Sequence, residues 1–164
     1  MRRLGDGVEA ALHCVLLLAE VPRDNVLPGK SLAEFHGISE TYLFKHLRAL
    51  VAAGIVEALP GPRGGYRLNH KPEKITLLDI VEAIDGKEPA FVCREIRRRG
   101  PCKSNDPCAY KTDCFIKVRM LDAENIWRDA LRQQTLQDLL EDGARMINDD
   151  TQNAISSFIE RAQR

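Results

Sequence analysis

Apolar and polar residues alternate at helical spacing from the start of the chain. Over residues 7–20 an apolar side chain recurs every three or four positions, which predicts a helix with one buried face. Cys14 lies in this segment, where a lone cysteine is usually a small buried hydrophobe rather than a metal ligand. We therefore expect the helix to form part of a core.

Two capped helices follow, joined by a very short turn. Ser31 precedes a short helix over residues 32–37 that Gly37 ends, and Ser39 precedes a longer helix over residues 40 to about 53. This arrangement predicts a helix-turn-helix. In the longer helix, leucines at core spacing occupy one face. A second face of the same helix consists of Thr41, Phe44, Lys45 and Arg48. In a helix-turn-helix this face would contact DNA, whereas in an isolated amphipathic helix it would be only a solvated surface.

A hairpin pattern comes directly after the helix-turn-helix. Residues 55–59 alternate as in a strand, GPRGG is typical of a turn, and YRL opens a returning strand. Two helices followed by a two-stranded hairpin predict a winged helix. Arg63 at the tip and Arg67 on the return strand are placed where a wing meets the DNA backbone or minor groove. The alternative is that both arginines only keep the hairpin soluble.

The second half of the chain is predicted to be helical on both sides of a cysteine-rich loop. Thr76 caps a helix that stops at Gly86, and residues 115–134 form an uninterrupted helical stretch. The preceding small domain has little surface left to cover the apolar stripe of this long helix, so we expect a second copy of the chain to cover it. The stripe consists of Met120, Ala123, Trp127, Ala130 and Leu131.

The predicted fold is therefore mainly α with a small β-hairpin wing. A winged helix-turn-helix domain over 1–86 is followed by the cysteine-rich loop over 87–114 and by the long dimerisation helix with a short helix, capped by Thr135, over 115–142. A tail over 143–164, beginning at Gly143, contains one more amphipathic segment. The apolar run near residue 18 is too short to span a membrane, and no cleavable signal precedes it, so we expect a soluble, cytoplasmic protein.

Charge is unevenly distributed although the formal net charge is zero. Residues 39–71 carry five basic and two acidic side chains, residues 87–119 carry nine and four, and residues 120–164 carry five and nine. A chain that is basic where it would meet phosphates can bind nucleic acid despite a neutral total. No phosphate-binding loop or Ser/His/Asp pattern is present, which disfavours an enzyme.

Four of the five cysteines lie within 22 residues at the spacing C-x8-C-x5-C-x5-C. Cysteines in the cytosol stay reduced, so this group favours metal binding or redox chemistry over a disulfide framework. Structural zinc sites typically use paired C-x2-C knuckles, whereas iron-sulfur clusters accept longer intervals. An iron-sulfur cluster is therefore the first hypothesis, with zinc or a thiol switch as alternatives.

The segments ISETYL, LRALVAAGIVEALPGPRGGYRL, ITLLDIVEAIDG and TLQDLL, with the cysteine loop between the last two, resemble the Rrf-two family of winged-helix transcription regulators. The resemblance covers residues 1 to about 142 and implies a homodimer that binds a double-stranded DNA operator. It also implies a recognition helix from Ser39 onward in the major groove, including Glu40 and Tyr42, and a wing in the minor groove comprising Pro62, Arg63, Gly64, Gly65 and Tyr66.

Cluster-bearing members of the family hold a [2Fe-2S] or [4Fe-4S] cluster with three cysteines that the resemblance places at Cys102, Cys108 and Cys114. Cys93 departs from the family pattern and is the favoured fourth ligand. Relatives take that ligand from a histidine after the third cysteine or from an acidic residue in the partner's first helix. The chain has Lys117 near the first position and Val8 near the second, with Glu9 beside Val8, so Glu9 is the second candidate.

Overall fold

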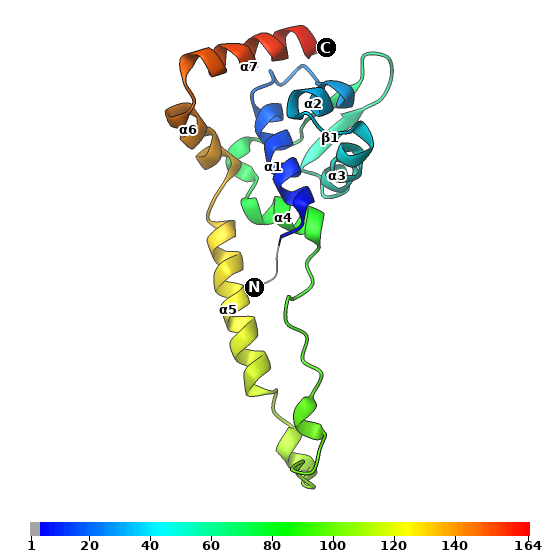
Figure 1. Cartoon of the computed structure of the whole chain (residues 1–164), viewed down its shortest axis with the longest axis vertical. Helices are drawn as coiled ribbons and strands as arrows, with labels where there is room; N and C mark the ends of the chain where they lie inside the picture. The colour runs from blue at the N-terminus through cyan, green and yellow to red at the C-terminus, as the bar shows by residue number, and fades with distance from the viewer. Residues whose placement is uncertain (1–3) are drawn as a thin grey trace.

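The computed structural model describes residues 4–164 as an elongated molecule. A helical domain with a β-hairpin forms one end, and a small knob of short turns, residues 93–114, forms the other (Figure 1). The long helix α5 runs between them. Within the described residues, no helix has both the length and the apolar character needed to cross a bilayer.

The winged helix-turn-helix predicted from the sequence is confirmed. Its elements are α1 (Asp6–Ala19), α2 (Gly29–His36), α3 (Glu40–Ala52), β1 (Val56–Leu59), β2 (Gly65–Leu68) and α4 (Leu77–Asp85), with a 3-10 turn at Pro72–Lys74. The two strands pair antiparallel in the register Val56 with Leu68 and Leu59 with Gly65. This mainly helical architecture with a two-stranded wing is the predicted fold class.

Most of the predicted helix boundaries are present. The Ser39 hydroxyl accepts the Tyr42 amide at 3.2 Å, and Gly37 ends α2 with φ of 63°. The predicted cap at Ser31 is wrong, because α2 begins at Gly29, two residues earlier. Pro28 precedes it with an extended backbone, and its carbonyl accepts the Leu32 amide at 3.1 Å, so the chain is already helical when it reaches Ser31.

The core of the domain surrounds α1. Cys14 is fully buried within it, as predicted, and burial raises the pKa of its thiol to about 12. Two residues far along the chain also enter this core, Leu136 and Ile159. The domain that presents the recognition helix is therefore completed by the C-terminal part of the chain.

The C-terminal half contains α5 (Phe115–Arg132), α6 (Leu136–Met146) and α7 (Asp149–Ala162). Thr135 caps α6 with Asp138 in the same reciprocal arrangement by which Thr76 caps α4 with Asp79. We expected the short helix to end at 142, but α6 continues through Gly143 to Met146, because a glycine inside a helix costs only about 1 kcal/mol.

Near its C-terminal end, helix α5 contacts the domain through Arg128, which donates to the Glu82 carboxylate of α4. This contact supplies an intrachain neighbour that the sequence did not lead us to expect. None of the residues of α5 is buried in the single chain, and its exposed apolar side chains include Phe115 and Ile126.

Candidate nucleic-acid interface and cysteine site

Helix α3 has an apolar inner face and a polar outer face. Leu43, Leu47 and Leu50 are fully buried, which fixes the rotation of the helix. That rotation leaves Ser39, Glu40, Thr41, Tyr42, Lys45 and Arg48 exposed. The exposed residues, two of them cationic, are therefore available to phosphates and base edges.

Phe44 and Tyr66, both expected at the DNA interface, are half-buried and converge on Gly29 at the start of α2. A Cβ added to Gly29 would lie 2.4 Å from Phe44 Cε1 and 3.1 Å from Tyr66 Cε2. The two rings thus pack the wing and the recognition helix against α2. The chemical type of these residues gave no sign of this role, because the packing joins three separate segments.

The wing extends away from the domain as a short turn. Pro62 and Arg63 are exposed at its tip, and Gly61 takes a φ of 101° that L side chains rarely adopt. Arg67 lies lower on the hairpin, where its Nε donates to Glu57 Oε2 at 2.9 Å and its Nη1 to the Arg23 carbonyl at 3.5 Å. Arg63 is therefore better placed than Arg67 to reach DNA.

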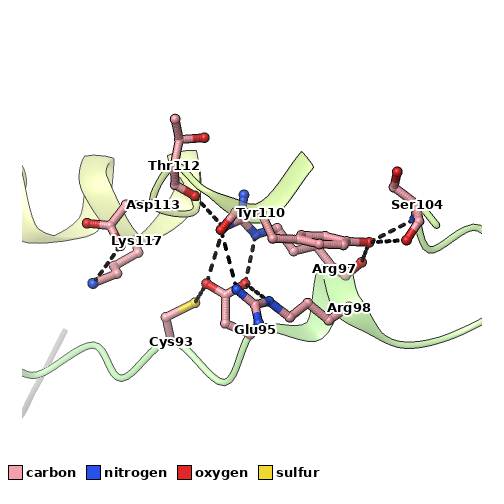
Figure 2. A network of polar contacts seen from close by, with 9 residues as sticks. All are labelled: Cys93, Glu95, Arg97, Arg98, Ser104, Tyr110, Thr112, Asp113 and Lys117. Carbon is pink, nitrogen blue, oxygen red and sulfur yellow. Dashed lines mark hydrogen bonds and ion pairs between the residues drawn. The ribbon is translucent and has the colours of Figure 1, made fainter. Parts of the chain in front are cut away.

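The cysteine knob, residues 93–114, is held together by a polar network around Glu95 (Figure 2). Glu95 has a left-handed backbone, with φ of 50°, and its carboxylate accepts Arg97 Nε at 2.8 Å. Arg97 also donates to the Thr112 carbonyl at 2.6 Å, which joins the two ends of the knob. These contacts were not predicted, although the single acid before a run of arginines was a sequence signal for them.

Tyr110 lies at the centre of the same knob. Arg97 and Arg98 stack on its ring, with guanidinium carbons 5.5 and 5.1 Å from the centroid. Its hydroxyl accepts the Ser104 amide at 2.8 Å and donates to the Arg97 carbonyl at 3.2 Å. Hydrogen bonds and cation-π contacts therefore fold the knob, in a segment whose few apolar residues are mostly exposed.

The four cysteines differ in their surroundings. Cys114 is 7% exposed and Cys93 is half-buried, whereas Cys102 and Cys108 are exposed. Cys114 is the residue that precedes α5, so its sulfur lies beside the backbone amides at the start of that helix. The Lys117 amide in particular lowers the Cys114 pKa, and the Ile116 amide, a hydrogen bond from Cys93 and the charge of Arg97 lower it further.

The structure thus brings Cys93 beside Cys114 and leaves Cys102 and Cys108 on the outer turns of the knob. Between residues 4 and 164, no three His, Cys, Asp or Glu side chains are grouped so that they could hold a metal ion. The donor set itself, four thiols amid guanidinium groups, has the chemistry that an iron-sulfur cluster requires. Binding one would require the turns that carry Cys102 and Cys108 to close on the Cys93 and Cys114 pair.

Three residues of the apolar stripe of α5, which the sequence predicts to mediate dimerisation, line a groove between α4 and α5. The groove has a volume of about 750 Å³ and is lined by residues that include Met120, Ala123 and Trp127 of α5 and Leu78 and Val81 of α4. Trp127 remains 41% exposed there. Ala130 is exposed and Leu131 half-buried, and neither lines the groove.

A helix-turn-helix with a basic outer face, followed by a hairpin with an arginine at its tip, defines a winged-helix DNA-binding protein. The chain belongs to the Rrf2 family, described as iron-dependent transcriptional regulators, whose model matches residues 4–142. The members of this family regulate transcription and are not enzymes.

Individual relatives agree with this assignment. The chain is 33% identical over 115 residues to the protein rrf2 of Nitratidesulfovibrio vulgaris, covering 70% of this chain and 71% of the relative. It is 29% identical over 132 residues to the transcriptional regulator IscR of Vibrio campbellii, covering 80% and 73%. The solved structure of CymR, the global cysteine regulator of B. subtilis, superposes with a TM-score of 0.62 at 26% identity, covering 86% and 98%.

Proposed function

We propose that the protein is a dimeric, cytoplasmic transcription regulator whose affinity for its operator is set by an iron-sulfur cluster. The ligands in this proposal are Cys93, Cys102, Cys108 and Cys114. The family's description as iron-dependent regulators supports a role for iron. The observation that carries the proposal is the gathering of four free cysteines in one knob, where the connection from the winged-helix domain meets the first turn of α5.

The place of the knob in the chain gives ligation a route to the DNA-binding domain. Residues 87–92 connect α4 to the knob, and the Ala90 amide donates to Glu124 of α5 at 2.8 Å. Ligation across Cys93 and Cys114 would fix the distance between this connection and the start of α5. If α5 forms the dimer interface, the same constraint would set the spacing of the two recognition helices. Operator affinity can depend on the cluster only if this spacing differs between the cluster-bound and cluster-free protein.

Protein groups prepare the site for anionic ligands. The first amides of α5, and then the guanidinium of Arg97, lower the pKa of Cys114 and so favour its thiolate form. Arg94, Arg99, Lys103 and Lys111 add exposed positive charge around the knob. When bound, a cluster would supply a centre that responds to iron supply, nitric oxide or redox state.

Anaerobic reconstitution with ferrous iron and sulfide tests the proposal. The expected result is visible absorbance, with iron and sulfide bound in equal amounts, and an altered affinity for a duplex that the protein selects from a random library. Absence of iron uptake, or identical DNA affinity with and without iron, would contradict it. A colourless protein that carries stoichiometric zinc would favour zinc at the same cysteines.

A dithiol switch is the second candidate, and the proximity of Cys93 and Cys114 favours it. In this reaction the two thiols would lose two protons and two electrons to form one disulfide, and an oxidant such as glutathione disulfide would be reduced to two thiols. Peptide mapping after oxidation of the iron-free protein should then find Cys93 linked to Cys114. Unlinked thiols under these conditions would exclude this switch.

A further inference from the structure

Helix α7 lies beyond residue 142, where the family model ends, yet it packs on the DNA-binding domain. The Phe158 ring meets the Phe35 ring of α2 nearly edge-on, with centroids 5.0 Å apart, and Ile159 is buried in the core. Asn148 caps the helix by accepting the Thr151 amide at 2.9 Å. Figure 1 shows α7 lying across the domain, with its last turn directed toward the wing.

Beyond α7 the chain becomes extended and pairs with the loop between α1 and α2. The Arg164 amide donates to the Val26 carbonyl and the Val26 amide to the Arg164 carbonyl, both at 3.0 Å. The next residue, Leu27, pairs in the same way with Tyr66 of β2, at 3.0 and 2.8 Å. Val26 therefore bonds to the tail on one side and Leu27 to the wing on the other, as consecutive residues of an extended strand do.

The packing at this junction leaves little room for movement at the base of the wing. A Cβ added to Gly65 would lie 2.5 Å from the Leu27 carbonyl oxygen. The tip of the wing extends beyond these backbone pairs. There the Arg164 guanidinium donates to the Pro62 carbonyl at 2.5 Å, across 102 residues of sequence.

We propose that α7 and Arg164 form a strut that positions the wing before it meets DNA. The side chain of Arg164 holds the Pro62 carbonyl, and this contact fixes the neighbouring Arg63 in the direction in which it reaches the duplex. Arg164 is thus a positioning residue that acts through Arg63. A wing that is already ordered loses less conformational freedom on binding, so the strut raises DNA affinity.

This inference rests on the DNA-binding part of the proposed function and does not depend on the cysteines. It is tested with the whole chain by substituting Arg164→Ala, with Arg161→Ala as the matched control. Arg161 is an exposed arginine of the same α7, and its removal changes the charge equally. Arg164→Ala keeps both backbone bonds to Val26, so α7 should stay docked, and an unchanged melting temperature verifies this.

The first readout is amide hydrogen exchange over residues 61–64, where the Gly64 amide donates to the Gly61 carbonyl at 2.8 Å. Exchange there should accelerate several-fold in Arg164→Ala and stay at the parental rate in Arg161→Ala. Unchanged exchange in Arg164→Ala would overturn the proposal. The measurement uses neither DNA nor iron, so the exchange result can be interpreted even if the cluster proposal fails.

The second readout is affinity for the selected duplex in a double-mutant cycle with Arg63→Ala. Arg164→Ala should weaken binding several-fold in the parent and have little effect when Arg63 is already alanine. Additive losses, with the salt slope falling by about one for each arginine, would mean that Arg164 contacts a phosphate itself and would overturn the positioning role. Unchanged affinity in Arg164→Ala would overturn it as well.

Discussion

His46 of the recognition helix lies directly against Gly7 in the first turn of α1. A Cβ added to Gly7 would come within 2.2 Å of His46 Cε1, and the imidazole is only 6% exposed. The Tyr42 ring also meets the imidazole nearly edge-on, at 4.7 Å between centroids. The rotation of α3 is therefore set partly by contact between an imidazole and a bare backbone.

Gly7→Ala should destabilise the winged-helix domain. The added methyl group would lie 2.2 Å from the imidazole, so the cost should fall in the upper part of the range of about 1–3 kcal/mol for overpacking and exceed the gain of about 1 kcal/mol from alanine in a helix. Gly143→Ala is the matched control, because its Cβ would meet only Ile147 Cδ1, at 3.7 Å. Urea unfolding should show a lower free energy of unfolding than the parent for Gly7→Ala and no decrease for Gly143→Ala. Equal stability of the two variants would contradict this packing.

The same contact predicts a dependence of stability on pH. Burial, and then the charge of Lys45, lowers the pKa of His46 below its ordinary value of 6.5, and burial also lowers that of His36. Because the unfolded chain binds these protons more readily, stability should be complete above pH 6.5 and fall as the pH drops toward the folded-state pKa. His46→Gln should reduce the slope of unfolding free energy against pH and leave only the part of the slope that is due to His36. Urea unfolding at several pH values measures this slope. A slope equal to that of the parent would rule out His46 as a source.

Arg63→Ala should weaken DNA binding and make it less sensitive to salt. Loss of one phosphate or minor-groove contact should reduce the slope of log affinity against log salt by about one. Arg145→Ala on α6 is the control, since Arg145 is exposed and forms an ion pair with Asp142 of its own helix. Equal slopes for Arg63→Ala and the parent would show that the wing tip does not contact DNA.

Trp127→Ala should weaken self-association. If the groove between α4 and α5 accepts a second copy, loss of the indole should cost on the order of 3 kcal/mol of association free energy, or roughly a hundredfold in the dimer dissociation constant. Trp127→Phe, which keeps an aromatic ring, should stay closer to the parent. Sedimentation at low concentration measures both, and a fully dimeric Trp127→Ala would place the interface elsewhere.

Serine substitutions should separate the cysteine ligands from the structural cysteine. Serine replaces a soft thiolate with a hard, weakly acidic hydroxyl, so Cys102→Ser, Cys108→Ser and Cys114→Ser should each lose most of the bound iron after reconstitution. Cys14→Ser should keep its iron, because Cys14 is a core residue.

Cys93→Ser decides the fourth ligand. If Cys93 holds that place, its substitution should lose iron as the other three do. If Glu9 of the partner subunit holds it, Glu9→Ala should release iron and Cys93→Ser should retain it. Iron and sulfide analysis of both variants distinguishes these outcomes, and iron retention by both would exclude both candidates.

The sequence by itself determined the elements whose causes are local. Caps at Ser39, Thr76 and Thr135 were predictable because each hydroxyl accepts an amide three residues ahead, and the wing because its glycines and arginines are adjacent in the chain. The cysteine group was evident from spacing alone. Ser31 shows the limit of this reasoning, because Pro28 had already started the helix.

The tertiary structure decided what depends on residues distant in sequence. Phe44 lies on the face of α3 that the sequence assigned to DNA contact, and only the packing around Gly29 turns its ring toward the domain. The proximity of Cys93 to Cys114 follows from how Arg97 joins the two ends of the knob. The contact of Arg164 with Pro62 spans 102 residues, and no periodicity encodes it, because it exists only once α7 has packed against the core.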